Sequence, residues 1–394
     1  MAARSWLRVL VAGAAVLGLA GCSKADRAVL TAPACPDGPS ARPVQRDLPR
    51  GTVYAWGPQF GAPEEPFEQR AVPGWTDVVS VADSGWTTVA VRADGSVWSY
   101  GTNVEGSLGR GSGERVREAV PRRVPGIERA HAVYSSGPTF YVVLRDGGVM
   151  AWGSDKFLVR GGRREGNGGV SVPERMDGVG GVVGMGPGLL NAFALRGNGT
   201  VLGWGINVTD VLGDRDGTVL GRIDGVSGVV DVASAGGAVV ALKADGRVCA
   251  WGNNAHGLLG VEQLGGQTGR PVLVPGLDDI VQVVGGSDVA YALDRKGAVW
   301  AWGRGASGSL GDGDGEDHAV ARPVRVTGLP PIRRVSAFQL TGYAIDTDGD
   351  MWGWGSGLAL GPHAPDGTGK PVRVPLPGPV LEVSGRHALV AGTR

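Results

Sequence analysis

The stretch GAVWAWG, residues 297–303, decides the fold of this chain because its pattern recurs along the sequence. It places two tryptophans at alternate positions among small residues, with a glycine at each end. The other copies are GTVYAWG (51–57), GSVWSYG (95–101), GGVMAWG (147–153), GTVLGWG (199–205), GRVCAWG (246–252) and GDMWGWG (349–355). Successive copies begin 44 to 52 residues apart, a period typical of solenoids, propellers and other repeat arrays.

Each copy reads as a strand that is covered on both faces. Side chains alternate between the faces of a strand, so one face receives Trp300 and Trp302 while the other receives Val299 and Ala301. A large face on one unit and a small face on the next would interdigitate if the sheets stacked side by side. That arrangement is the packing of β-propeller blades.

The rest of each unit supplies three further apolar runs, which makes four strands per unit. Runs such as VVDVASAG (229–236) and AVVALKADG (238–246) precede the copy, and RPVLVPG (270–276) follows it after a long loop. The chain ends after two such strands, and it begins, past residue 50, with the other two. We therefore predict an all-β fold, a seven-bladed β-propeller of four-stranded antiparallel blades whose last blade is closed by both termini.

The repeats resemble the regulator of chromosome condensation repeat family. The resemblance rests on the copies above and on the sequences that follow them, such as YGTNVEGSLGRG (100–111) and WGNNAHGLLG (251–260), and it covers residue 51 to the C-terminus. It implies a seven-bladed propeller. Family repeats usually carry a histidine ahead of the second strand, and only His387 keeps it. The other matched positions hold Thr87, Phe140, Asn191, Ala238, Val289 and Thr341.

The N-terminal region has the features of a lipoprotein signal. Arg4 and Arg8 precede thirteen apolar or small residues, too few to span a bilayer, and LAGC (19–22) resembles the bacterial lipobox. We predict a signal peptide over 1–21, acylation of Cys22, a Pro-rich flexible tether over 22–50 and the propeller over 51–394. The alternative is an ordinary secretory signal with an incidental cysteine.

Two further cysteines, Cys35 and Cys249, lie in the tether and in a repeat. A disulfide between them would tie a flexible tail to a strand, so we favour two independent thiols, with the disulfide as the alternative in an oxidising compartment.

Composition and motifs exclude several functions. The chain has 38 basic and 38 acidic side chains, so its net charge favours neither nucleic acid nor an anionic surface. The histidines lack ligand spacing, and we find no phosphate loop, nucleophile elbow or other catalytic constellation. We expect no enzyme activity, no cofactor and no metal. A weak metal candidate is the loop bearing Asp312, Asp314 and Glu316.

The long loops after the repeats are the least alike, and they would gather on one side of the propeller. Two adjacent blades offer basic residues, and the fifth and closing blades offer acidic ones. The basic set that we predict to bind a partner is Arg110, Arg115, Arg117, Lys156, Arg160, Arg163 and Arg164. The acidic set is Asp312, Asp314, Glu316, Asp317, Glu64, Glu65 and Glu68. Ordinary solvated loops are the alternative to such a charge-polarised docking face.

We therefore expect a monomeric binding module on the extracytoplasmic face of a bacterial membrane, where it would recognise a protein or cell-envelope ligand. Two other functions stay open. Related propellers in secreted bacterial proteins include β-lactamase inhibitors, so the resemblance allows an inhibitor of an extracellular enzyme. Propeller enzymes can assemble carboxylates from several blades, which allows an envelope saccharide- or peptide-acting enzyme. Guanine-nucleotide exchange, the activity of the family's eukaryotic founder, is disfavoured by export.

Overall fold

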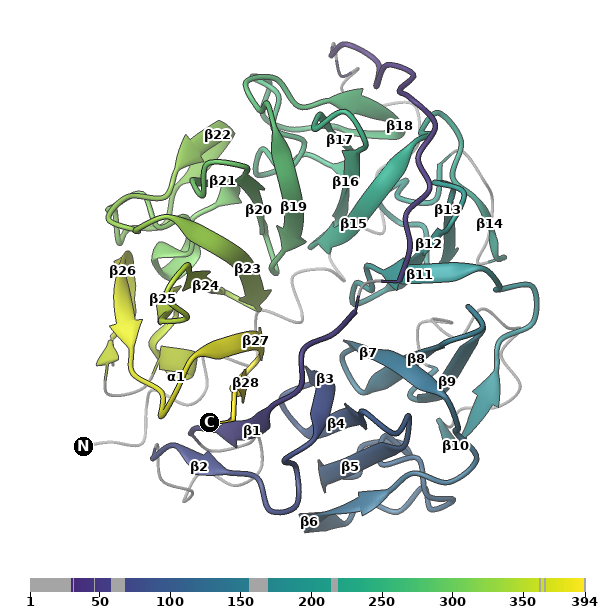
Figure 1. Cartoon of the computed structure of the whole chain (residues 1–394). Helices are drawn as coiled ribbons and strands as arrows, with labels where there is room; N and C mark the ends of the chain where they lie inside the picture. Colours follow the sequence, from purple (N-terminus) through teal and green to yellow (C-terminus); the bar gives the residue numbers. More distant parts are fainter. Residues whose placement is uncertain are drawn as a thin grey trace.

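The computed structural model describes residues 30, 32–45, 47–57, 68–155, 169–213, 219–360, 363–364 and 366–392. Over these residues the strands form seven four-stranded antiparallel sheets, which stand around a central axis as propeller blades (Figure 1). The predicted fold class is confirmed.

The strands of the first three blades run in chain order. They are β3 (Val78–Asp83), β4 (Thr87–Arg92), β5 (Val97–Thr102) and β6 (Arg117–Arg123); β7 (Ala130–Ser136), β8 (Thr139–Leu144), β9 (Val149–Gly153) and β10 (Val170–Arg175); and β11 (Val182–Met185), β12 (Asn191–Arg196), β13 (Val201–Gly205) and β14 (Gly221–Arg222).

The fourth to sixth blades follow the same plan. They are β15 (Val229–Ala235), β16 (Ala238–Lys243), β17 (Val248–Asn253) and β18 (Gln267–Leu273); β19 (Ile280–Gly285), β20 (Val289–Asp294), β21 (Val299–Arg304) and β22 (Ala319–Arg325); and β23 (Ile332–Phe338), β24 (Thr341–Asp346), β25 (Met351–Gly355) and β26 (Thr368–Val374). A 3₁₀ turn (Ala306–Gly308) and the short helix α1 (Gly357–Leu360) lie in the loops that precede β22 and β26.

The closing blade is built from both ends of the chain, as predicted. Its sheet order is β2 (Arg70–Ala71), β1 (Thr52–Ala55), β28 (His387–Val390) and β27 (Val380–Ser384). β1 pairs antiparallel with β28, with Val53 opposite Leu389. This pairing closes the ring, because it joins strands from the two ends of the chain and leaves neither β1 nor β28 at the edge of a sheet.

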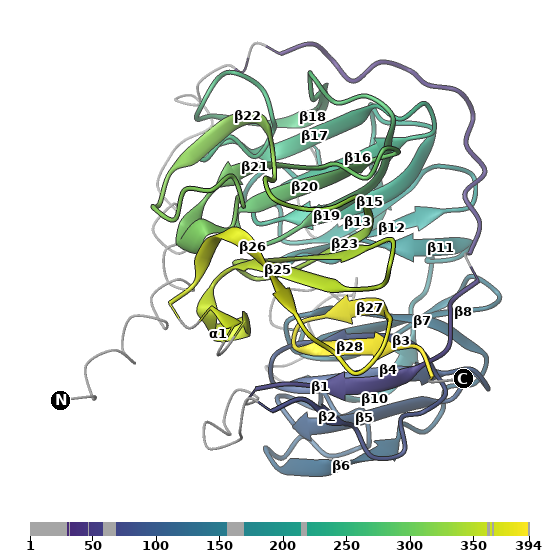
Figure 2. The ribbon, with the colours of Figure 1, turned by 60° about the vertical axis from the view of Figure 1, so that its left-hand side comes forward.

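The two faces of the disc differ. We call the face that carries the turns between second and third strands, and the connections between blades, the hairpin face. The opposite face carries the turns between first and second strands and the long loops between third and fourth strands, and we call it the loop face. Figure 2 shows α1, which belongs to the loop face, on the side opposite the purple segment that leads to β1. None of the helices among the described residues has the length and apolar character needed to cross a membrane.

The large-on-small packing predicted from the repeat is confirmed. Trp302 of β21 is fully buried in a cluster with Val248 and Ala250, which belong to the small face of the fourth blade. The small face requires small residues: a Cβ added to Gly353 would lie 2.5 Å from Leu360, and one added to Gly203 would lie 2.8 Å from Ile223. The residues of GAVWAWG are therefore structural.

The inner strands are joined by polar side chains that accept a backbone N–H of the next blade. Ser80 Oγ accepts from Val133 N at 3.2 Å, and Asp231 Oδ2 accepts from Val283 N at 3.3 Å. Further round the ring, Gln282 Oε1 accepts from the backbone N–H of residue 335 at 2.9 Å. These bonds satisfy backbone donors that face the axis.

Residues 32–45 and 47–50, which we call the strap, lie against the hairpin face, where Figure 1 shows them crossing from β18 to β1. The Cys35 N–H donates to the Pro271 carbonyl at 2.9 Å, and Gln45 Nε2 donates to the Leu144 carbonyl at 2.8 Å. Ala41 is buried. The prediction of a free flexible tether is therefore wrong for this part of the segment, because its backbone and side chains find partners on the propeller.

Cys35 and Cys249 form a disulfide, with their Cα atoms 5.8 Å apart. The expectation of two independent thiols is therefore wrong. That expectation assumed that Cys35 lies in a free tail, but the segment that carries it is hydrogen-bonded to β18. Cys249 is fully buried at the repeat position predicted for it, but as half of a crosslink that spans 214 residues of sequence.

The crosslink gives a first prediction. Replacing Cys35 by Ser should lower the free energy of unfolding by about 2–5 kcal/mol, because a crosslink over a long loop restricts the unfolded chain. Chemical denaturation of the parent and the variant measures this difference. A reducing agent should destabilise the parent and leave Cys35→Ser unchanged; equal stability of the two oxidised proteins would contradict the prediction.

Candidate functional site

Indole N–H groups join neighbouring blades on the loop-face side. Each donates to a main-chain carbonyl in the long loop of the preceding blade, at distances of 2.7 to 3.0 Å. The pairs are Trp152 with Ser107, Trp251 with Val211, Trp302 with Leu258, Trp354 with Ser309 and Trp56 with Ala359. A buried indole needs such an acceptor, so each blade fixes the base of its neighbour's loop.

The junction between the closing and first blades is different, because the first blade carries Tyr100 where the repeat elsewhere has tryptophan. The Tyr100 hydroxyl lies 2.5 Å from Nε2 of His387, and the Nδ1 of that histidine lies 3.2 Å from Asp83 Oδ2. All three residues are buried. We call Asp83, His387 and Tyr100 the seam cluster.

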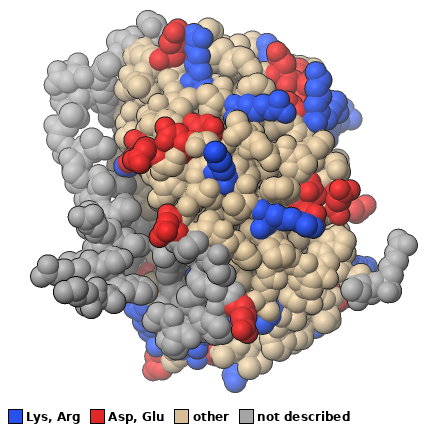
Figure 3. All heavy atoms as spheres, turned by 90° about the vertical axis from the view of Figure 1, so that its left-hand side faces the viewer, with Lys and Arg blue, Asp and Glu red and all other residues tan. Residues whose placement is uncertain are grey.

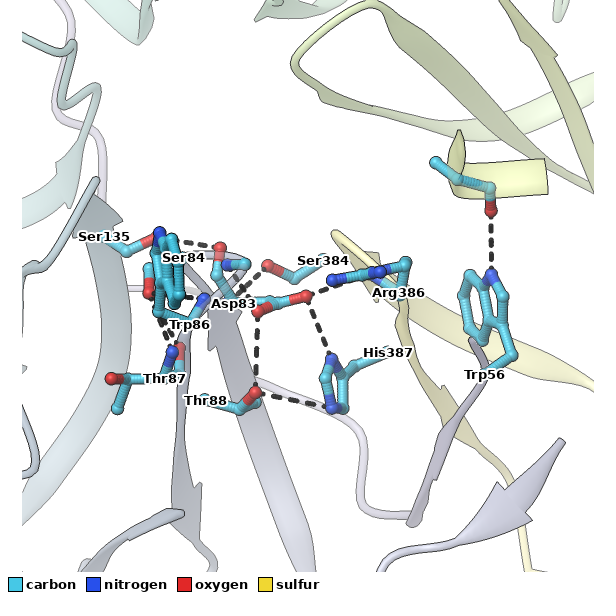
Figure 4. Close-up of polar contacts among 12 residues, drawn as sticks. Trp56, Asp83, Ser84, Trp86, Thr87, Thr88, Ser135, Ser384, Arg386 and His387 are labelled. Atoms are coloured by element: carbon cyan, nitrogen blue, oxygen red, sulfur yellow. Dashed lines mark hydrogen bonds and ion pairs between the residues drawn. The ribbon is translucent and has the colours of Figure 1, made fainter. Parts of the chain in front are cut away.

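The carboxylate of Asp83 also accepts backbone donors from both blades (Figure 4). The Gly85 N–H donates to Oδ1 at 2.8 Å, and the Arg386 N–H donates to Oδ2 at 3.1 Å. The N–H of Asp83 itself donates to Ser384 Oγ at 3.1 Å. The two chain ends therefore meet around one carboxylate.

The pKa of Asp83 follows from these contacts. Burial of the carboxyl acts to raise it, but the charge and hydrogen bond of His387, with Arg386, lower it to about 2 from 3.8. Asp83 is therefore ionised at neutral pH. A buried carboxylate of this kind is stable only while its partners remain in place.

The arrangement has the chemical order of a catalytic triad. Asp83 lies at one ring nitrogen of His387, and Thr88 Oγ1 lies 3.4 Å from the other. However, Thr88, His387 and Asp83 are at most 3% exposed, and Tyr100 also contacts Nε2. A triad works only if a substrate reaches its nucleophile. Because this one is sealed between blades, we assign it to closure of the ring.

The register of the strands corrects the position of His387 within the repeat. His387 pairs with Ala55, just as Tyr141 pairs with Ala151 and Tyr291 with Ala301. It therefore lies two residues inside the strand relative to Thr87, which pairs with Gly101. Sequence matching placed His387 and Thr87 together because the turn from β27 to β28 is shorter than the turn from β3 to β4. Phe140 is likewise displaced by one residue, since Thr139 is the partner of Gly153.

On the loop face beside the seam, Trp86 and Arg115 form a cation–π pair. The guanidinium carbon of Arg115 lies 5.0 Å from the centroid of the Trp86 ring, and Trp86 is half-buried in the turn between β3 and β4. Figure 4 shows Trp86 beside Ser84 in this turn. Trp86 was not among the predicted site residues. The available signal was that it lies outside the repeated frame.

The predicted basic residues are only partly brought together. Arg115 and Arg117 are exposed on the loop face, but Arg110 points inward, 16% exposed, with its Nη2 2.6 Å from Glu118 Oε2. Arg110 also donates to the Ser99 carbonyl at 3.1 Å, so it holds the loop against β5. Lys156, Arg160, Arg163 and Arg164, like Glu64 and Glu65 of the acidic set, lie outside the described residues.

The acidic loop of the fifth blade does not converge on a metal site. Asp312 Oδ1 and Asp314 Oδ1 accept the backbone N–H groups of residues 314 and 316, and His318 Nε2 lies 2.9 Å from Asp312 Oδ2. Across the described ranges, no group of three His, Cys, Asp or Glu residues is placed to hold a metal ion. The sequence DTDGD (346–350) forms the turn after β24, where Asp346 accepts the N–H groups of Asp348 and Asp350.

Charges of both signs are interspersed over the side of the molecule that Figure 3 shows. Several form ion pairs, including Arg304 with Asp317 at 2.6 Å and Arg322 with Glu262 at 2.7 Å. Exposed pairs of this kind contribute little to stability. They do reduce the charge that the fifth blade offers to a partner.

Comparison with known proteins adds a family match. The model for the RCC1-like domain matches residues 51–391. Among solved structures, human WBSCR16 aligns over 88% of this chain and 100% of its own, with a TM-score of 0.76 and 22% identity. Yeast RCC1 (Prp20), in a crystal structure with Kap60, aligns over 93% of this chain and 97% of its own, with a TM-score of 0.74 and 20% identity. At these identities the likeness shows the fold.

Curated relatives match parts of the chain. The mitochondrial RCC1 domain-containing protein RUG3 of Arabidopsis thaliana is 27% identical over 78% of this chain and 62% of its own length. Human E3 ubiquitin-protein ligase HERC2 is 33% identical over 20% of this chain and 2% of its own. The Arabidopsis ultraviolet-B receptor UVR8 is 36% identical over 20% and 18%. The chain thus spans less than two thirds of the length of each.

The seam cluster gives a second prediction. Asp83→Asn should lower the free energy of unfolding at pH 7 by about 2–4 kcal/mol, because it removes the charge that His387 and Arg386 surround. The depressed pKa makes the charged carboxylate stabilising above pH 3.8 and progressively less so as the pH falls toward 2. Denaturant titrations of both proteins at pH 7 and pH 3 measure the difference.

Arg50→Ala is a suitable control for that titration, because Arg50 and Asp77 form an exposed pair whose nearest atoms are 3.9 Å apart. It should change the stability little at either pH. If the difference in free energy of unfolding between the parent and Asp83→Asn stays constant from pH 7 to pH 3, the charge of Asp83 is not what stabilises the seam.

Proposed function

The chain belongs to the RCC1-like domain family, and on that premise we propose that it is a binding module exported to the outer face of a bacterial membrane and held there by an acyl group on Cys22. Its ligand is a protein or another component of the cell envelope, bound on the loop face. The crystal structure of the yeast relative contains that protein bound to Kap60, and a second concerns its binding to Gsp1p and histones. Those partners are proteins, which supports protein binding here.

The observation that carries the proposal is the division of each blade into a constant and a variable part. The indole-to-carbonyl bonds recur at blade after blade, whereas the loops whose bases they fix differ in length and composition. Binding residues are disproportionately found on such loops over a rigid scaffold. The Trp86–Arg115 pair offers the two residue types that contribute most at interfaces.

The disulfide supports export. Disulfides persist in oxidising compartments and are rare in the cytosol of ordinary cells. The Cys35–Cys249 crosslink therefore agrees with the signal peptide predicted over residues 1–21. Acylation of Cys22, which lies outside the described residues, belongs to the proposal.

Two alternatives have different consequences. An inhibitor of an extracellular enzyme would also bind through the loop face, and its partner would lose activity in the complex. An envelope enzyme would need an accessible catalytic group. The Asp83–His387 pair is the most triad-like arrangement in the described residues, and burial withholds it from substrates. This favours the two binding functions.

The third prediction tests the loop face. Trp86→Ala and Arg115→Glu should each weaken retention of the envelope partner at least about tenfold, because they remove an aromatic and a cationic contact. The measurement is the affinity of the chain from residue 23 onward for the protein it retains stoichiometrically from envelope extract. Arg295→Glu, on the hairpin face, is the matched control and should bind as the parent does.

The predicted basic set is tested in the same assay by reversing the charges of Arg160, Arg163 and Arg164 together. If charge steers the partner, the triple variant should capture less of it than the parent does. Added salt should also weaken capture by the parent. Unchanged capture by all of these variants would contradict the loop face as the binding surface. Turnover of envelope polymers without any partner would favour the enzyme instead, and loss of the partner's activity would favour the inhibitor.

A further inference from the structure

The strap leaves the propeller at a defined place, the hairpin-face edge of the fourth blade. It pairs antiparallel with the end of β18, where Ala34 bridges Val272 and the Leu273 N–H donates to the Pro33 carbonyl at 2.9 Å. Since β18 runs from the loop face to the hairpin face, the chain before Ala34 leads back toward the hairpin face. Leu30 packs on the apolar cluster that includes Val272 and Val274.

Several contacts lock the strap in this position. The disulfide joins Cys35 to β17, and the Lys243 ammonium donates to the Pro36 carbonyl at 2.6 Å. Lys243 is buried, and burial lowers its pKa. Further along, Gln45 Nε2 reaches the carbonyls of Leu144 and Val182 from one amide. The exit point is therefore fixed to the body of the propeller.

The length of chain before the strap limits how far this edge can lie from an anchor. Eight residue steps separate Cys22 from Leu30, and even fully extended they span about 27 Å. The strands of the fourth blade are six or seven residues long, so the loop face lies about 20 Å beyond the hairpin face. For the loop face to meet the lipid instead, about 20 Å of that span would have to run along the outside of the blade, so an acyl chain on Cys22 favours the hairpin face as the nearer one.

We propose that the hairpin face of the propeller is turned toward the lipid surface and the loop face is turned away from it, with the Cys35–Cys249 crosslink fixing this orientation. The inference rests on the proposed acylation of Cys22. It deepens the proposed function because it leaves the Trp86–Arg115 surface open to partners outside the membrane, with the strap between the hairpin turns and the headgroups.

The experiment measures the distance of each face from the bilayer. The acylated full chain is placed in vesicles of phosphatidylethanolamine and phosphatidylglycerol that contain an acceptor-labelled lipid. A donor dye is attached, without reduction of the disulfide, to Lys296→Cys on the hairpin face or to Leu264→Cys on the loop face. Both positions are exposed. Thermal melting of each labelled protein verifies that it folds as the parent does.

Because about 20 Å separates the faces, energy transfer to the lipid should be at least about twofold more efficient from residue 296 than from residue 264. The double variant Cys35→Ser, Cys249→Ser should reduce that ratio, since hydrogen bonds alone then hold the strap. A ratio of one or less in the crosslinked protein overturns the orientation.

Flotation of the same vesicles separates this inference from the proposal on which it rests. Protein that floats with the vesicles but shows no preference between the two labels is anchored without the proposed orientation. Full-length protein that does not float lacks the anchor, which overturns both the membrane attachment and the orientation but leaves binding by the loop face to its own assay.

Discussion

The propeller depends on one repeated contact, which the described residues show at five blade junctions: an indole N–H crosses from one blade to a loop carbonyl of the blade before it. Burying a tryptophan removes a large apolar surface from water, but its N–H must find an acceptor. Here the acceptors are carbonyls such as those of Leu258 and Ser309, at the base of the long loops. The same contact that stacks the blades thus fixes where each loop begins. The rest of the loop is left without that constraint, so variation there does not cost the ring its closure.

The seam is the place where this contact is replaced. The closing blade combines strands from both ends of the chain, and the blade that follows it carries Tyr100 instead of tryptophan. A phenol can both donate and accept, so it bonds to a histidine side chain instead of a carbonyl, and the histidine in turn needs the carboxylate of Asp83. The ring is closed by a buried charged network at one junction and by neutral indole bonds at five others. Such a network is more sensitive to pH and to the loss of one member than the neutral bonds are.

The architecture could be predicted from the sequence because it follows from a local pattern repeated seven times. The alternation of Trp300 and Trp302 with Val299 and Ala301 is sufficient to predict a strand that is covered on both faces. The strap could not be predicted this way, since a Pro-rich segment has no periodicity and its partners lie in blades up to 240 residues away, as in the bond from the Leu273 N–H to the Pro33 carbonyl. The pairing of Cys35 with Cys249 depends on that tertiary placement. Tyr100 was visible as the one repeat without a final tryptophan, but its partner His387 was assigned to the wrong register, because turn length sets the register and matching of letters does not.

The strap and the inner ring complement each other. The polar residues that link inner strands are Ser80, Asp231, Gln282 and Glu382. The Glu382 carboxylate bonds to the backbone of Val81. Burial raises the pKa of Glu382, and the positive charge of Arg334, 3.5 Å away, partly opposes this shift. The equivalent positions in the second and third blades hold Ala132 and Gly184, which have no such group. The strap crosses this sector, where Gln45 joins Leu144 of the second blade to Val182 of the third. A segment outside the repeats therefore adds a link between the second and third blades, where Tyr134 also bonds to the backbone of Met185 and Ser136 donates to the Gly188 carbonyl.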